Sequence, residues 1–258
     1  KQLSARLNPI FASMQSISAE VSRSPRTVVF AEGEEERSIR AAIAYRNAGY
    51  GKAILVARRR KVEQTLQDLS IRPEELDGIS ISNARESAHA GEYADFLYSR
   101  LQRRGLLQRD RERMVNLDRN IFAACMVATG NADAMVTGLT RSTAVCLRDI
   151  RNVIDPAPGQ ICFGLSLMVG PSGNTLFLAD TLMHVRPTAE EFADIAIGAA
   201  QAARRLGHEP RVALISHSTF GNQLHADAEA MPDAVRVLDA RGVDFEYDGE
   251  MSPRSEEH

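Results

Sequence analysis

The sequence predicts an α/β/α protein with two domains and a mainly parallel β-sheet. Short segments rich in β-branched residues alternate along the chain with segments whose apolar residues recur at helical spacing. Strands that alternate with helices favour parallel βαβ units, in which helices cover both faces of the sheet. The chain has 258 residues, of which 44% are hydrophobic. This is enough for two domains of about 100–150 residues each.

The first domain is predicted at residues 25–140, after a helical lead-in. Residues 1–24 carry apolar side chains at helical spacing, and Pro25 ends that segment. The acids of FAEGEEER are explained as residues of the first turn of the next helix, where the helix dipole favours negative charge. The predicted strands of this domain are 27–33, 52–57, 78–83 and 132–138, and its main helices are 34–51, 61–71, 92–105 and 118–130.

The second domain is predicted at residues 141–258, where the regular alternation changes. The turn PSGN between two apolar segments favours a β-hairpin. Thr188, followed three residues later by Glu191, forms the capping box of a long amphipathic helix. The predicted strands are 159–170, 175–180, 211–216 and 243–250, and the helices are 188–207 and 231–242.

Composition restricts the classes of function. The net charge of −3 gives no general case for a nucleic-acid partner, and none is expected. The cysteines lie in apolar segments without CxxC spacing, which is typical of a reduced, cytoplasmic protein without a zinc site. No apolar run reaches the roughly 20 residues that span a bilayer, and no signal peptide leads the chain, so we expect no membrane partner.

Common catalytic signatures are absent from the sequence. It contains no GxGxxG, P-loop, HExxH or GxSxG motif, which argues against a dehydrogenase built on a Rossmann fingerprint. SHSTFGN follows a predicted strand, at the edge where open α/β sheets bind ligands, so Ser218 and Thr219 are candidate contacts. Ser216 and His217 are adjacent in the chain and would point to opposite faces, which disfavours a Ser–His nucleophile pair.

The stretch VTGLTRSTAVCLRDIRNVI is the best candidate for a binding site. A turn of small residues precedes a predicted helix, and the free N–H groups of a helix N-terminus attract phosphate. Ser142 and Thr143 are candidate hydrogen-bond donors, and Arg141, Arg148 and Arg151 are candidate charged contacts. The alternative is an ordinary capped helix whose arginines face water.

A second basic segment, SRLQRRGLLQRDRER, contains Arg103 and Arg104. Such a cluster can bind a polyphosphate, for example the nucleotide end of coenzyme A. The alternative is a solvated helix face whose charge is partly compensated by neighbouring acids. Nucleic-acid binding is disfavoured because no aromatic stacking residues are interleaved with the arginines.

Five segments in order resemble the phosphate acetyl/butyryltransferase family: VVFAEGEEERSIRAA, MVTGLTRSTAVCLRDI, FLADTLMHVRPTAEEFADIA, RVALISHSTFGN and VDFEYDGEM. Within that family, FAEGEEER and DRNIFAACMVATGNADAMVTG are similar to the phosphotransacetylase-like C-terminal domain of bacterial hybrid NADP-dependent malic enzymes. The resemblance implies the two-domain phosphate acetyltransferase fold, which is isocitrate/isopropylmalate dehydrogenase-like, and a homodimer or higher homo-oligomer. It also implies a malic enzyme unit as partner, which binds NADP and a divalent metal outside this chain.

The resemblance further implies a site that binds acetyl-CoA as an allosteric inhibitor and has no catalytic residue, cofactor or metal of its own. RSTAVCLR aligns with the transferase pattern HSTADTLR, but Arg141 replaces a histidine and Val145 replaces the aspartate. The transferase segment PVNDLSRG has no counterpart here, and the last strands of the first domain are expected to be missing. The alternatives are an active phosphate acetyltransferase and a purely structural dimerisation domain. The predicted ligand contacts are Ser142, Thr143, Arg148, Arg141, Arg103, Arg104, Ser218 and Thr219.

Overall fold

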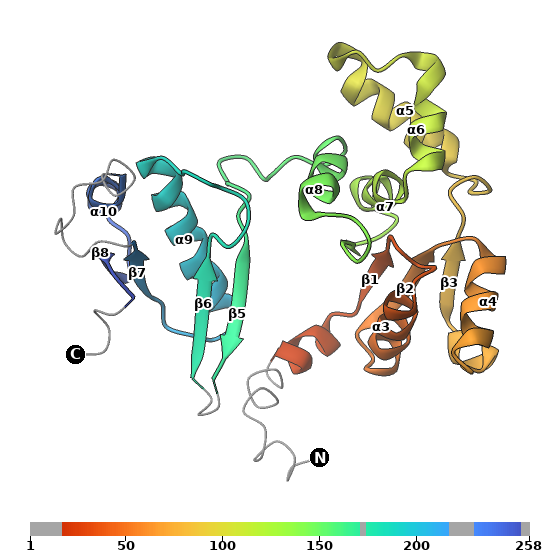
Figure 1. Cartoon of the computed structure of the whole chain (residues 1–258), viewed down its shortest axis with the longest axis horizontal. Helices are drawn as coiled ribbons and strands as arrows, with labels where there is room; N and C mark the ends of the chain where they lie inside the picture. The colour runs from red at the N-terminus through yellow and green to blue at the C-terminus, as the bar shows by residue number, and fades with distance from the viewer. Residues whose placement is uncertain (1–16, 171–173, 217–229, 254–258) are drawn as a thin grey trace, which may run out of the picture. The chain divides into compact units, whose positions relative to one another are not determined.

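The structure is a computed structural model that describes residues 17–170, 174–216 and 230–253 (Figure 1). The described residues form two compact units, the first of Ser18–Asp155 and the second from Pro156 onward. Within the described part, no helix has both the length and the apolar character needed to cross a membrane.

Four parallel strands form the sheet of the first unit, in the order β3-β2-β1-β4 (Figure 1). They are β1 (Arg26–Phe30), β2 (Gly51–Val56), β3 (Ile79–Ser82) and β4 (Ala134–Val136). The central strand β1 places Val28 opposite Ala53 of β2 on one side and opposite Ala134 of β4 on the other. Each strand lies where the sequence predicts one, and the predicted α/β class with parallel strands is confirmed. All four carboxyl ends therefore lie along one edge of the sheet.

Alternate side chains of β1 enter two separate cores. Val29 packs with α5 and α7, whereas Phe30 packs with α3 and α4. Helices therefore bury both faces of the sheet, as period-two alternation of side chains requires. The helices of this unit are α3 (Glu36–Asn47), α4 (Arg59–Asp68), α5 (Ala90–Leu101), α6 (Arg111–Leu117), α7 (Arg119–Ala128) and α8 (Thr143–Arg151), with the short 3₁₀ helices η1 (Pro73–Leu76), η2 (Gln102–Arg104) and η3 (Gln108–Asp110).

In the first unit, one helix is not predicted by the sequence, and one predicted helical segment is only partly described. Helix α6 was not predicted, because its segment was interpreted only as a basic cluster. Residues 17–23 are helical and lead into β1, whereas the remainder of the predicted lead-in, residues 1–16, lies outside the described residues.

The regular elements in the described part of the second unit are two pairs of strands and two helices (Figure 1). Met168 of β5 lies opposite Leu176 of β6, which confirms the predicted antiparallel pair, and β7 pairs with β8 in parallel. The predicted capping box is also confirmed: the Thr188 hydroxyl accepts from the Glu191 N–H at 3.3 Å, and the Glu191 carboxylate accepts from the Thr188 N–H at 2.8 Å. The elements are β5 (Leu165–Val169), β6 (Thr175–Ala179), α9 (Ala189–Arg205), β7 (Arg211–Ile215), α10 (Ala230–Arg241) and β8 (Glu246–Met251).

The two units divide at Asp155, later in the chain than residue 140, which is the predicted end of the first domain. Helix α8 belongs to the first unit, because it packs against α7. Val153, just beyond α8, is buried in the same core as α5 and α7. The change of pattern near residue 141 therefore marks the start of this packed helix, and the contact boundary falls at Asp155.

Candidate functional site

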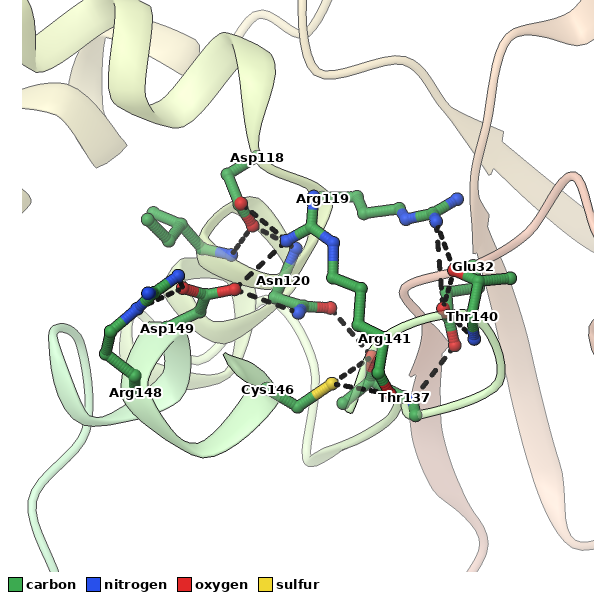
Figure 2. A network of polar contacts seen from close by, with 12 residues as sticks. Glu32, Asp118, Arg119, Asn120, Thr137, Thr140, Arg141, Cys146, Arg148 and Asp149 are labelled. Carbon is green, nitrogen blue, oxygen red and sulfur yellow. Dashed lines mark hydrogen bonds and ion pairs between the residues drawn. The ribbon is translucent and has the colours of Figure 1, made fainter. Parts of the chain in front are cut away.

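The carboxyl edge of the four-stranded sheet gathers many polar groups of the first unit. Glu32 follows β1, Arg58 follows β2, Asn83 follows β3 and Thr137 follows β4. Open parallel sheets bind ligands at this edge, where the loops that leave the strands enclose a crevice. Figure 2 shows the polar network that joins the loops after β1 and β4 to α7 and α8.

The carboxylate of Glu32 occupies a cradle of hydrogen-bond donors after β4 (Figure 2). Only 1% of Glu32 is exposed. One carboxylate oxygen accepts from the N–H groups of Gly138 (2.9 Å) and Leu139 (2.5 Å), and the other accepts from the N–H (2.8 Å) and hydroxyl (2.5 Å) of Thr140. We call Glu32 and residues 138–140 the Glu32 cradle. Successive N–H groups of this kind form an anion site, which the chain here fills with its own carboxylate.

The electrostatics of the cradle keep Glu32 ionised. Burial acts to raise the pKa of Glu32, but hydrogen bonds from Thr140 and Leu139 and the charge of Arg119 outweigh burial and lower that pKa. Arg119 lies 3.7 Å from the Glu32 carboxylate and donates to the Thr140 hydroxyl at 2.6 Å. A carboxylate held in this way does not exchange protons near neutrality, so Glu32 is suited to fixing the turn after β4 against β1.

A second group of charges lies at α8 and is called here the Arg141 cluster: Arg141, Asp118, Asp149 and Arg148 (Figure 2). Nη1 of Arg141 donates to Asp118 at 2.6 Å and to Asp149 at 3.0 Å. Arg148 donates to the second carboxylate oxygen of Asp149 at 3.1 Å. The hydrogen bond to Asp118 is the main cause that raises the pKa of Arg141. Arg141 is therefore a fixed cation.

The predicted contacts at the start of α8 are not all brought together. Ser142 is the N-cap residue, but its side chain forms no capping hydrogen bond, and both Ser142 and Thr143 are exposed. Arg148 lies six residues after Ser142, which corresponds to about 9 Å along a helix axis. The N–H groups of the preceding turn bind Glu32 instead of an external anion. Arg141 directly follows this turn, but its guanidinium points to Asp118 and Asp149 (Figure 2).

The other predicted contacts lie elsewhere. Arg103 and Arg104 are exposed on η2, at the end of α5. The pKa of Asp155 is lowered mainly by a hydrogen bond from Arg100 and also by the charge of Arg104, which places Arg104 in a basic region near the end of the first unit. Ser218 and Thr219 lie outside the described residues.

Two pockets open beside the Arg141 cluster. The sheet-edge pocket has a volume of about 300 Å³ and is lined by Glu34, Val56, Ala57, Arg58, Asn83, Ala84, Arg85, Asn116, Leu117, Arg119 and Arg141. The helix pocket has a volume of about 650 Å³ and is lined by Leu106, Asp110, Arg113, Met114, Leu117, Asp118, Ile121, Arg148, Asp149 and Asn152. Both volumes fall in the range of about 300–1,000 Å³ typical of small-molecule sites.

The two pockets differ in charge. Four arginines and one carboxylate line the sheet-edge pocket, whereas two arginines, three carboxylates and four large apolar side chains line the helix pocket. The predicted contacts Arg141 and Arg148 are thus divided between the pockets. The sequence does not predict Arg58, Arg85 and Arg119 as contacts, because they lie far apart in the chain and only the folding of the first unit brings them to one pocket.

No group of three or more His, Cys, Asp or Glu side chains in the described ranges is arranged to hold a metal ion. Cys125 is buried in the core, and burial raises its pKa to about 12, so its thiol is not activated as a nucleophile. The chemistry that the described site supports is anion binding by fixed guanidinium groups.

Comparison with known proteins assigns the fold to a family. Residues 12–253 match the phosphate acetyl/butaryl transferase family. The chain is 51% identical over 254 residues to the NADP-dependent malic enzyme of Rhizobium meliloti (strain 1021), a match that covers 98% of the chain and 33% of that protein. It is 31% identical over 234 residues to the phosphate acetyltransferase of Clostridium acetobutylicum, covering 88% of the chain and 69% of that protein. The chain thus spans about a third of the malic enzymes that it matches.

Solved structures confirm the predicted fold. A phosphotransacetylase from Streptococcus pyogenes superposes with a TM-score of 0.83 at 26% identity, covering 95% of this chain and 75% of that one. The EutD phosphotransacetylase from Staphylococcus aureus superposes with a TM-score of 0.80 at 23% identity, covering 93% and 73% respectively.

Proposed function

The chain belongs to the phosphate acetyl/butaryl transferase family, and from this premise we propose that it is the acetyl-CoA-responsive regulatory domain of an NADP-dependent malic enzyme. The observation that carries the proposal is the match of 98% of the chain, at 51% identity, to 33% of such an enzyme. In this proposal the remaining part of the protein decarboxylates malate and binds NADP and a divalent metal, and acetyl-CoA lowers that activity.

The helix pocket provides contacts that suit an acyl thioester of coenzyme A. Leu106, Met114 and Ile121 supply an apolar wall for the acyl and pantetheine groups, and Arg113 and Arg148 supply charged donors for phosphate oxygens. Arg148 is 69% exposed and bonded on one side only to Asp149, so part of its guanidinium can turn to a ligand. Arg103 and Arg104 are retained in the proposal as contacts for the nucleotide end.

Two side chains support binding without acyl transfer. At the position of the aspartate in the transferase pattern HSTADTLR, this chain has Val145, which carries no charge. Arg141 stands in place of a histidine, and its hydrogen bonds to Asp118 and Asp149 keep it a cation that accepts no proton. A regulatory role further requires two states with different affinities for acetyl-CoA.

The test is malate decarboxylation by the full-length protein, measured with and without acetyl-CoA. We expect inhibition, and we expect Arg148→Ala to raise the half-inhibitory concentration about tenfold, the equivalent of one lost charge-assisted contact. Arg60→Ala, which removes an exposed arginine that lines neither pocket, is the matched control. Activity that does not respond to acetyl-CoA would refute the proposal. Sustained coenzyme-A-dependent consumption of acetyl phosphate would favour the transferase alternative.

We also propose that the protein forms a homo-oligomer through the β5–β6 pair. Met168 and Leu176 lie opposite each other in this pair and are 53% and 55% exposed, and Leu178 on the same face is 40% exposed. Apolar groups that gather on one face mark interaction surfaces more often than scattered ones do. Leu176→Glu should lower the mass observed in sedimentation equilibrium, and an unchanged mass would exclude this face.

A further inference from the structure

The sheet-edge pocket supplies none of the acetyl-CoA contacts named above, yet its lining has the composition of a binding site. The loops after β1, β2 and β3 supply three of its walls, and α6, α7 and the turn between β4 and α8 supply the remainder. It opens at the carboxyl edge of the sheet, whereas the helix pocket lies against α6 and α8. The two pockets have only Leu117 in common.

Three of its four arginines are fixed by carboxylates. Arg58 forms a bidentate pair with Glu34, with Nε–Oε1 and Nη2–Oε2 distances of 2.7 and 2.9 Å. Arg119 is held by Glu32 and Thr140 through Nη2, and Arg141 is held in the Arg141 cluster through Nη1. Each guanidinium has five N–H donors, so Arg119 and Arg141 keep donors beyond those engaged in these contacts. A carboxylate that binds one edge of a guanidinium fixes its orientation, so the N–H groups of the other edge are available to a ligand.

The fourth arginine, Arg85, contributes a charge that is not balanced locally. Its side chain is exposed, and no carboxylate of the described residues lies within ion-pair distance of it. Its backbone N–H donates to Oδ1 of Asn83, which fixes the loop after β3 in the pocket wall. A ligand with negative charge would therefore gain the charge of Arg85 without displacing an existing ion pair.

A buried acceptor in the wall points to a second feature of the ligand. Oδ1 of Asn116 is buried and has no hydrogen-bond partner in the described part of the chain. A buried acceptor without a partner is costly, and most such groups in proteins are satisfied by water or by a ligand. Asn116 lines the pocket, so a rotation of its side chain toward the open volume would let Oδ1 accept from a ligand hydroxyl.

We propose that the sheet-edge pocket binds a small phosphate monoester that carries a hydroxyl group next to its phosphate. A tetrahedral dianion accepts from several directions, which matches guanidinium groups on separate loops and helices better than a planar monocarboxylate does. The pocket volume of about 300 Å³ suits a ligand of a few carbons rather than a whole coenzyme. Two sources share this chemistry: a free hydroxyalkyl phosphate and the ribose 3′-phosphate of coenzyme A with its neighbouring 2′-hydroxyl.

The binding experiment is calorimetry on the full-length protein with glycerol 3-phosphate, inorganic phosphate and glycerol as probes. We expect glycerol 3-phosphate to bind more tightly than phosphate, and glycerol not to bind. Arg85→Ala should weaken glycerol 3-phosphate at least about tenfold, and Arg60→Ala should leave it unchanged. Asn116→Leu should remove the preference for glycerol 3-phosphate over phosphate and leave phosphate binding itself in place. The absence of binding by both anions, or equal binding to wild type and Arg85→Ala, would overturn the proposal.

A second binding experiment distinguishes a free hydroxyalkyl phosphate from the ribose 3′-phosphate of coenzyme A as the ligand. It also tests this proposal separately from the proposed binding of acetyl-CoA. Acetyl-CoA and 3′-dephospho-acetyl-CoA are compared as ligands of the wild type, Arg85→Ala and Arg148→Ala. If the pocket holds the 3′-phosphate, a case that rests on the proposed function, the wild type prefers acetyl-CoA and Arg85→Ala does not. If the pocket takes a free phosphate monoester, Arg85→Ala binds acetyl-CoA normally and loses glycerol 3-phosphate. Failure of all coenzyme A ligands refutes the proposed function alone, because glycerol 3-phosphate still decides the site.

Discussion

The Glu32 cradle and the sheet-edge pocket lie at the same edge of the same sheet. The cradle is filled by a carboxylate of the chain itself, whereas the pocket is open. In the cradle, three successive N–H groups and a hydroxyl converge on the chain's own carboxylate. In the pocket, three of the four guanidinium groups are held by carboxylates on one side, and the pocket between them is open. Both regions have the chemistry of anion binding.

The difference shows that a local anion-binding pattern does not reveal which anion fills it. The small-residue turn before α8 provides the donors that a phosphate requires, but Glu32 reaches them from the turn after β1, more than a hundred residues earlier. The pocket has no local pattern at all, because its arginines come from separate loops and helices. In the folded protein, the recognisable turn before α8 has a structural role. The arginines of the sheet-edge pocket, which form no motif together, line a candidate site.

Removal of Glu32 should produce the largest effect. In Glu32→Ala the N–H groups of Gly138, Leu139 and Thr140 lose their acceptor and Arg119 loses a buried partner. We expect the first unit to lose about 3–5 kcal/mol of its free energy of unfolding, the range for breaking a buried charge pair. Native-state hydrogen exchange of the β1 and β4 amides measures this loss in the first unit alone.

The same variant leaves the three N–H groups of the cradle free to bind an external anion. Added phosphate should partly restore protection in Glu32→Ala, since an anion that binds only the folded state stabilises it. The matched control is Glu36→Ala, which removes an exposed carboxylate that pairs with Arg40 in the first turns of α3. A loss in Glu36→Ala as large as that in Glu32→Ala would show that the cradle has no special role.

The second effect in size is expected for Arg141→Ala. This change leaves Asp118 without its ion pair and leaves the buried Asp149 with Arg148 and Asn120 as its partners. Because Arg141 is 29% exposed, solvent compensates part of the loss, and we expect about 1–3 kcal/mol of destabilisation. Hydrogen exchange in α7 and α8 measures it, and exchange equal to the wild type would contradict the assignment of Arg141 as a structural cation.

The third prediction concerns acid. The folded-state pKa of Glu32 lies below that of an unfolded glutamate, about 4.3. Its contribution to stability is therefore complete above that value and is lost as the pH falls toward the lower, folded-state pKa. Glu32→Gln should be less stable than the wild type at neutral pH and should lose less of its remaining stability between about pH 4.5 and pH 3. Parallel stability curves for the two proteins would exclude Glu32 as a source of the acid dependence.

The fold was largely predictable from the sequence, because its signals are local. The strands of the first unit are short apolar segments bounded by turns, and the capping box of Thr188 and Glu191 fixes the start of α9. Helix α6 was missed because its arginines dominate the segment, and only Val115 is fully buried in the structure. The contact boundary at Asp155 was not predictable from a change of pattern, since it depends on which core α8 joins.

The candidate site was only partly predictable, because its geometry is not local. Arg141 and Arg148 stand out beside a turn, but the structure assigns them to different pockets. The sequence assigns the acids of FAEGEEER, Glu32 among them, to an acidic helix start, whereas Glu32 lies in the turn after β1 and is buried. One signal was present in the sequence: a glutamate that directly follows a buried strand lies at the ligand-binding edge of a parallel sheet.

The smallest effect on stability is expected for Arg148→Ala, and this makes Arg148 the cleanest probe of function. Its guanidinium is 69% exposed and pairs with Asp149, which keeps Arg141 and Asn120 as partners. An exposed ion pair of this kind contributes less than about 1 kcal/mol, so hydrogen exchange in α8 should be nearly unchanged. Any change in acetyl-CoA response then reports on contact with the ligand rather than on folding. If Arg148→Ala instead destabilised α8 as strongly as Arg141→Ala, both arginines would be structural and the helix pocket would lose its proposed charged contact.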